Sequence, residues 1–177
     1  MIVGLIIACE VAFWVLLAAG LAFRYLLKMP RTGLALLLCE PLLELLLFVV
    51  TAVDLRNGAE PDWRHGLAAV YIGFTVGLGH STIAWADARI AHRFAGGPPP
   101  VKPPRYGMAR TVHECRVAGR WLVAALVAIG LLQAAIWYVG NGGTGSLRAW
   151  QWRMVWLIGV NVLIAASYAL FPKRRPA

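Results

Sequence analysis

Apolar residues run along this chain in five stretches, near 2–23, 33–53, 66–88, 118–139 and 152–171, each long enough to cross a bilayer as a helix. Polar residues collect between them, in short turns and in one longer connection at about 89–117, which contains AGGPPPVKPPRYG. The prolines of that connection favour a stiff, extended segment on the cytoplasmic surface. The pattern predicts an all-α integral membrane protein with about five transmembrane helices, in which residues 1–177 form a single domain.

The second stretch carries two carboxyl groups, Glu40 and Glu44, near its middle. They lie one helical turn apart and share a face, and alternating steps of three and four along that face collect Leu37, Glu40, Glu44, Leu47, Thr51 and Asp54. A carboxyl group in hydrocarbon costs on the order of 2–3 kcal/mol or more, so both must face protein or enclosed water. Pro41 lies between them and predicts a kink.

The third stretch combines close packing with ionisable side chains. Gly73 and Gly77 form a GxxxG pattern that allows another helix to approach, and the same face continues to His80, Ala84 and Asp87. Counting rise from the cytoplasmic ends of the helices places Glu40 and His80 at the same depth, about 12 Å. We therefore expect these two side chains to lie within hydrogen-bonding reach, directly or through one water, and to titrate as one coupled unit. His80 as a core imidazole bonded to a carboxylate is the alternative interpretation.

The remaining spans each add polar or aromatic side chains, and we expect these to meet in a common interior column. The candidates for substrate binding are Glu10, Trp14, Tyr71, Asp87, Gln133, Asn161 and Tyr168. For Glu10, a partly hydrated acid near the outer interface is an equal alternative.

Composition and charge agree with a membrane protein. The chain is 60% hydrophobic and only 14% charged, which excludes an ordinary soluble enzyme. Of the 17 Lys and Arg residues, all but Arg56, Arg64, Arg148 and Arg153 fall on one side of the predicted membrane, so the N-terminus is expected outside and the C-terminus in the cytoplasm. The net charge of +9 then faces anionic lipids of the bilayer, and nucleic acid is not expected as a partner.

The sequence gives no pattern for a cofactor. Its 3 cysteines lie in different segments, and no CxxC or HxxxH spacing supports a metal site or a disulfide. Bis-His haem ligation needs two mid-span histidines, and only His80 is placed in that way.

Several segments resemble a known group, the YmcC-like small bacterial integral membrane proteins, which have no assigned activity. These segments are LLCEPLLELLLFVVTAVDLRNGA, HGLAAVYIG, GHSTIAWADARIAHRFAGGPPP and SYALFPKR. The resemblance implies a multi-pass protein of the bacterial plasma membrane and assigns no catalytic residue. Two features of this chain, an acid on the second helix and a polar residue before Ser-Tyr on the last helix, make it similar in pattern alone to the membrane-bound terpene cyclases. Those proteins have more spans, and an acid where this chain has Asn161.

Three hypotheses of function follow. In an intramembrane enzyme, Glu40 or Glu44 is the proton donor and His80 its partner or base, while Trp14 and Tyr71 line an apolar chamber for an isoprenoid or lipid substrate. In a proton-coupled transporter for a small solute, the polar column crosses the bilayer, although the chain shows no internal repeat and five helices are few unless it forms a homo-oligomer. In a scaffold or accessory subunit, the same column fixes the register of the helices.

The distribution of Lys and Arg generates a prediction of topology. Cys115 lies in the longest connection, among the basic residues that the positive-inside rule places in the cytoplasm. In intact cells, a membrane-impermeant thiol reagent should leave Cys115 unlabelled until the membrane is permeabilised. Labelling of Cys115 before permeabilisation would overturn this topology.

Overall fold

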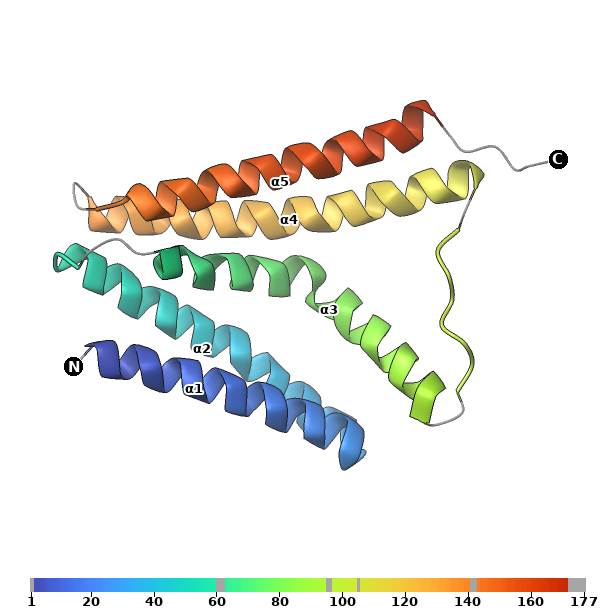
Figure 1. The fold of residues 1–177 in the computed structure, drawn as a ribbon, viewed down its shortest axis with the longest axis horizontal. Helices are drawn as coiled ribbons and strands as arrows, with labels where there is room; N and C mark the ends of the chain where they lie inside the picture. The colour runs from blue at the N-terminus through green and yellow to red at the C-terminus, as the bar shows by residue number, and fades with distance from the viewer. Residues whose placement is uncertain (1, 60–62, 95–96, 105, 141–142, 172–177) are drawn as a thin grey trace. The chain divides into compact units, whose positions relative to one another are not determined.

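The computed structural model describes residues 2–59, 63–94, 97–104, 106–140 and 143–171, without the side chains of residues 2–7, 9, 10, 64, 65 and 94. Within these ranges the chain is helical and contains no strand. The helices are α1 (Ile2–Leu21), which continues into the short π-helix η1 (Ala22–Leu26), α2 (Pro30–Arg56), the 3-10 turn η2 (Trp63–Gly66), α3 (Leu67–Phe94), α4 (Gly107–Val139) and α5 (Gly145–Leu170) (Figure 1). The predicted all-α class is confirmed.

Four of these helices, α2 to α5, are long and apolar enough to cross a membrane. The first predicted span is present as α1, and the part of it with described side chains, Val11–Leu26, is a shorter apolar helix. Pro41 lies inside α2. The apolar pattern therefore located each of the five α-helices in the part of the chain that the structure describes.

Two helices continue beyond the predicted spans near the longest connection. α3 continues to Phe94, and α4 begins at Gly107 instead of near residue 118. Residues 107–117 are too polar for hydrocarbon. They can still be helical, because α4 has 33 residues, is about 50 Å long and exceeds the roughly 30 Å of the bilayer core. The first turns of α4 thus extend beyond the hydrocarbon, and hydropathy alone does not detect them.

The chain divides into two compact units, and the single domain expected from the sequence stays a prediction. The first consists of Met1–Ile72 and Ala128–Gln151, and the second of Gly73–Val127 and Trp152–Ala177. Each of the long helices α3, α4 and α5 has one part in the first unit and the other part in the second. We describe each unit by itself.

In the first unit, α1 packs along α2 (Figure 1). Glycine makes the contact close, since a Cβ on Gly33 would lie 2.7 Å from the carbonyl oxygen of Gly20 and 2.6 Å from the Cβ of Arg24. The turn between the helices has Lys28 at φ 55°, and Nη1 of Arg24 donates a hydrogen bond to the Pro30 carbonyl at 3.1 Å. These contacts hold α1 and α2 as a tight helical hairpin.

Two side-chain hydrogen bonds join the other segments of the first unit. Nε1 of Trp150 donates to the carbonyl oxygen of Trp63 at 2.7 Å, and Nε2 of Gln151 donates to Oε1 of Gln133 at 3.0 Å. The largest fully buried side chains, Leu55, Leu132 and Leu147, belong to this unit. The start of α5 is therefore fixed both to α4 and to the turn before α3.

In the second unit, α3 and α4 meet at small residues. A Cβ on Gly77 would lie 2.6 Å from the carbonyl oxygen of Arg120 and 2.7 Å from the Cβ of Ala124. One turn earlier, Phe74 contacts Trp121 edge to face, with ring centroids 5.9 Å apart. The predicted close approach of another helix is confirmed at Gly77.

The path of α3 is not straight. It changes direction part-way along its length, as Figure 1 shows. Its middle contains Gly77, Gly79 and Ser81, and Oγ of Ser81 bonds to the carbonyl of Leu78 at 2.8 Å. Glycine together with a serine that bonds back into the preceding turn is a recognised cause of helix bending.

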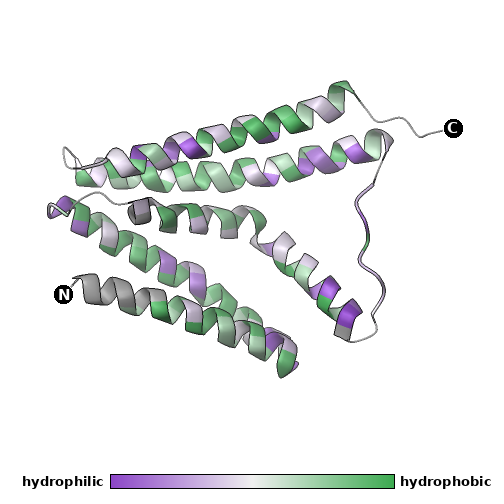
Figure 2. Ribbon diagram, viewed as in Figure 1, coloured by the Kyte–Doolittle hydropathy of each residue, from purple (hydrophilic) through white to green (hydrophobic). Residues whose placement is uncertain are grey.

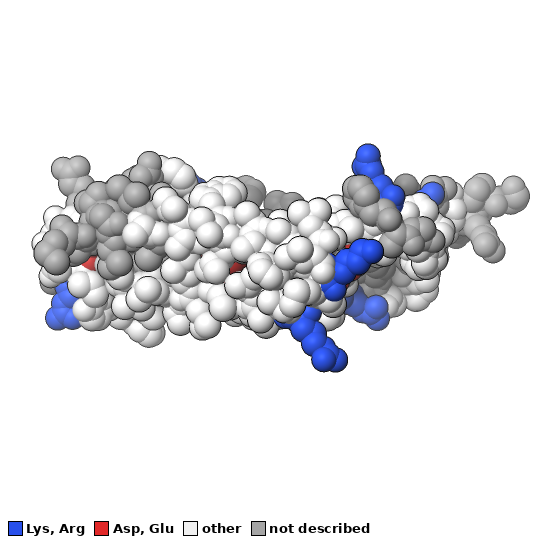
Figure 3. Space-filling model, turned by 90° about the horizontal axis from the view of Figure 1, so that it is seen from below, with Lys and Arg blue, Asp and Glu red and all other residues white. Residues whose placement is uncertain are grey.

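The surface of the helices suits lipid. Figure 2 shows hydrophobic residues on most turns, with hydrophilic ones gathered near the end of α3 and the start of α4. Of the 18 consecutive residues that form the most apolar part of α5, only 6% are buried within the protein. Most of this apolar helix therefore needs a hydrocarbon solvent. In Figure 3, Lys and Arg side chains stand out from a surface that is otherwise largely uncharged.

The contact at Gly77 generates a prediction of stability. Gly77→Leu should force α3 away from α4 and lower the free energy of unfolding by about 2 kcal/mol or more, because backbone atoms of α4 cannot move aside. Leu78→Ala changes a neighbouring, half-buried position and should have a much smaller effect. Thermal unfolding in detergent measures both variants, and equal melting temperatures would contradict the close contact.

Candidate functional site

The candidate site centres on Glu40, a buried acid on α2. Its side chain is only 4% exposed although it lies about 15 Å from the start of a helix that spans the membrane. One carboxyl oxygen, Oε2, accepts a hydrogen bond of 2.9 Å from the hydroxyl of Tyr71 on α3. The other oxygen, Oε1, is fully enclosed and has no hydrogen-bond partner among the described residues.

Aromatic rings continue from Tyr71 to the surface of the first unit. The ring of Phe13 on α1 meets that of Tyr71 edge to face, with centroids 5.2 Å apart and an interplanar angle of 85°. Phe13 in turn meets Trp14 at 5.5 Å and 80°. Trp14 is 67% exposed and lies in the middle part of the length of α1, away from the ends where interfacial tryptophans are usual. The acid is thus connected through aromatic side chains to the exposed surface of α1.

Glu44 lies one turn from Glu40 on the same helix and is half-buried. It interacts electrostatically with Tyr71, so both acids of α2 act on the same tyrosine. Of the residues predicted for the site, the structure therefore brings together Glu40, Glu44 and Tyr71, with Trp14 reached through Phe13. A carboxyl group held by one oxygen has the other available to donate or accept one proton.

The second unit contains His80, Asp87 and Asn161. His80 is exposed and Asp87 is half-buried. Nδ2 of Asn161 donates to the Leu157 carbonyl of its own helix at 2.9 Å. Because these residues belong to the second unit, their place relative to Glu40 stays a prediction, and so does the Glu40–His80 pair.

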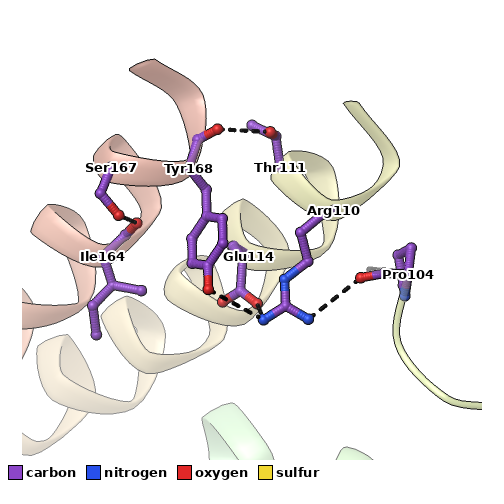
Figure 4. Close-up of polar contacts among 7 residues, drawn as sticks. All are labelled: Pro104, Arg110, Thr111, Glu114, Ile164, Ser167 and Tyr168. Carbon is purple, nitrogen blue, oxygen red and sulfur yellow. Dashed lines mark hydrogen bonds and ion pairs between the residues drawn. The ribbon is translucent and has the colours of Figure 1, made fainter. Parts of the chain in front are cut away.

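Two other predicted residues join helices to each other. Gln133 on α4 accepts the hydrogen bond from Gln151 on α5. Tyr168 on α5 accepts a hydrogen bond at its backbone carbonyl from Oγ1 of Thr111 at 2.9 Å, and its ring and hydroxyl contact Arg110 (Figure 4). Their described contacts are between α4 and α5, and substrate binding by these residues stays a prediction. The side chain of Glu10 lies outside the described residues.

Tyr71 is the partner of Glu40 that sequence reasoning did not identify. Depth was counted from the predicted end of the third span near residue 88, whereas α3 ends at Phe94, a difference of about 9 Å. The usable signal was chemical, since a buried tyrosine hydroxyl needs a partner and the acids of α2 are the strongest acceptors on the neighbouring span.

In the part of the chain with described side chains, no group of three or more His, Cys, Asp and Glu residues is placed to hold a metal ion. Cys39 and Cys115 are free thiols and both are exposed.

The fold and the composition define a multi-pass α-helical membrane protein with an acid buried between its helices. The chain is 36% identical to YmcC of Bacillus subtilis (strain 168), which is described as an uncharacterized membrane protein, over an alignment 182 positions long that covers 99% of this chain and 95% of that protein. The chain therefore belongs to the YmcC family of membrane proteins, as its sequence segments indicated. No protein-family model and no solved structure matches it. The similarity in pattern to terpene cyclases is not supported by these comparisons.

The hydrogen bond at Glu40 generates a prediction. Tyr71→Phe removes the donor and leaves a buried carboxyl group with neither oxygen paired to a described residue, which should lower the free energy of unfolding by about 1–3 kcal/mol. Tyr138→Phe is the matched control, because Tyr138 is exposed and its ring, which stacks under Arg56, is retained.

A double-mutant cycle separates the hydrogen bond from packing. Adding Glu40→Leu to Tyr71→Phe removes the polar partner as well, so the double variant should be no less stable than Tyr71→Phe alone. Strictly additive losses, measured by unfolding in detergent, would mean that the bond does not contribute.

Proposed function

We propose that this protein is an intramembrane acid–base enzyme of the bacterial plasma membrane, and that its substrate is an isoprenoid or another lipid that enters from the bilayer. Glu40 transfers the proton, and Tyr71 holds the carboxyl group in a fixed orientation. The observation that carries the proposal is the asymmetry of the Glu40 carboxyl group, in which Oε2 is anchored by Tyr71 and the enclosed Oε1 has no described partner.

The asymmetry supports chemistry because it is costly for structure alone. An enclosed polar atom without a hydrogen bond costs about 1–3 kcal/mol, and a glutamine would serve as well as a glutamate to join α2 to α3. An acid is useful at this position if its unpaired oxygen gives a proton to a reacting group or takes one from it. The hydroxyl of Tyr71 then acts as a positioning group, since it fixes one oxygen and leaves the other available.

The surroundings of the acid support an apolar substrate. Phe13 and Trp14 continue the ring contacts from Tyr71 to the surface of α1, where Trp14 is largely exposed. Aromatic faces bind hydrocarbon chains and also stabilise positive charge that develops during a reaction. Glu44, on the same face of α2, is the second acid of this site.

The other residues and partners have supporting roles in this proposal. His80, Asp87 and Asn161 belong to the second unit, and their part in this chemistry stays a prediction, as does substrate binding by Gln133. At the cytoplasmic side, Arg116 and Arg120 are exposed one turn apart on α4, where they bind anionic lipid headgroups and hold the helix at its depth.

A structural role is the second candidate, and one observation favours it. The bond between Tyr71 and Glu40 joins two helices within the first unit, in the same manner as the bond between Gln151 and Gln133. Such bonds fix helix register in a membrane protein without any chemistry.

Glu40→Gln distinguishes the two candidates, because glutamine keeps the hydrogen bond with Tyr71 but cannot transfer the proton. Membranes from cells that express the wild-type protein should differ from empty-vector membranes in at least one lipid species, measured by mass spectrometry of lipid extracts. Glu40→Gln should reduce that change by about a hundredfold or more while the melting temperature stays the same.

Glu114→Gln makes the same chemical change on the part of α4 beyond the hydrocarbon and should leave the lipid change intact. If the wild-type and empty-vector lipid profiles are identical, or if Glu40→Gln and the wild type give the same change, the enzyme proposal is wrong. A stable Glu40→Gln variant that gives the same lipid profile as the wild type would leave the structural role as the explanation.

A further inference from the structure

The connection between α3 and α4 has a composition unlike the rest of the chain. Residues 97–104 read GPPPVKPP and belong to the second unit. They form no helix or turn, and Figure 1 shows the connection as an extended trace. The site at Glu40 does not involve this segment, so its function is a separate question.

The prolines restrict most of the segment to extended backbone conformations. Each proline ring fixes its own φ near −65°, and the residue before a proline is confined to the extended or polyproline II region. In this segment Gly97, Pro98, Pro99, Lys102 and Pro103 all precede a proline. The segment therefore has little conformational freedom to lose when it binds another surface.

Both ends of the segment are held by hydrogen bonds from the flanking helices. At its start, the amide of Gly97 donates to the Ala91 carbonyl and Nδ1 of His92 bonds to the Gly97 carbonyl, each at 3.0 Å. At its end, Nη1 of Arg110 donates to the Pro104 carbonyl at 3.3 Å. The segment is thus fixed at two points with a free span between them.

Arg110 is itself fixed by three further contacts, and Figure 4 marks the two with Glu114 and the Tyr168 hydroxyl. Its Nη2 pairs with Oε1 of Glu114 at 2.6 Å and contacts the Tyr168 hydroxyl at 3.5 Å. Its guanidinium group stacks on the Tyr168 ring, 5.0 Å from the centroid. The anchor for Pro104 is therefore tied to both α4 and α5.

The free span presents apolar groups to water. Val101 is 98% exposed, and Pro98, Pro99, Pro103 and Pro104 are exposed as well. A polyproline II helix has three residues per turn, so Pro98, Val101 and Pro104 form one edge, Pro100 and Pro103 a second, and Pro99 and Lys102 the third. A spacer needs stiffness alone, whereas two apolar edges beside one charged edge are what an aromatic-lined groove recognises.

We propose that residues 97–104 are a docking segment for a cytoplasmic protein that has an aromatic-lined groove with an acidic rim. The two apolar edges enter the groove. The acidic rim meets Lys102, in a region of the chain where Lys and Arg far outnumber Asp and Glu. The clamped ends keep the segment extended and accessible beside the membrane.

The full-length protein in lipid nanodiscs, titrated with a panel of purified SH3, WW and EVH1 domains, tests this proposal. These domains bind polyproline II segments through aromatic grooves. We expect saturable binding by at least one domain with an acidic rim. Replacing Pro100 and Pro103 together by Ala frees the backbone at both positions and should weaken that binding about tenfold.

A charge-exchange variant keeps the stiffness of the segment and changes only its edges. Val101→Lys combined with Lys102→Val retains all five prolines but places the charge on an apolar edge. If the segment is a docking site, this variant should bind as weakly as the alanine variant. Absence of saturable binding across the panel, or equal affinity of the exchange variant and the wild type, would show that the segment is only a spacer.

Discussion

A carboxyl group inside a membrane protein must be covered, and this requirement organises the first unit. Glu40 is almost fully enclosed, and the hydroxyl of Tyr71 brings α3 against α2 at that point. Hydrocarbon offers no hydrogen bonds, so a polar atom on a membrane helix has to find its partner within the protein. The buried acid therefore specifies which face of α2 meets the first turns of α3 within this unit.

Close packing is what makes these few polar contacts sufficient. Gly33 meets Gly20 between α1 and α2 in the first unit, and Gly77 meets Ala124 between α3 and α4 in the second. Water cannot drive helices together within lipid, so stability depends on short contacts between small residues and on a small number of hydrogen bonds. The bonds from Gln151 to Gln133 and from Thr111 to Tyr168 each tie α4 to α5 in their own unit.

The helices were predictable because hydropathy is a local property, but the contacts of polar side chains were not. Asn161, for example, was expected in the polar column, and its described hydrogen bond goes to the Leu157 carbonyl of its own helix, as is common for short polar side chains. The first turns of α4 were assigned to a loop because their polarity resembles that of a loop. Arg110 and Glu114, four residues apart, form an ion pair there that needs the helix to exist.

By itself, the sequence determined that this is a helical membrane protein with an acid on its second span, since length, hydropathy and the cost of a buried carboxyl group are properties of the residues alone. It also indicated the YmcC family, which the relative from Bacillus subtilis confirms. Only the tertiary structure decided that Tyr71 is bonded to Glu40, that one carboxyl oxygen has no described partner, and that Arg110 anchors the proline-rich segment. These pairings depend on how far each helix extends beyond the hydrocarbon and on how helices tilt, and neither is encoded in the spacing of residues along one span.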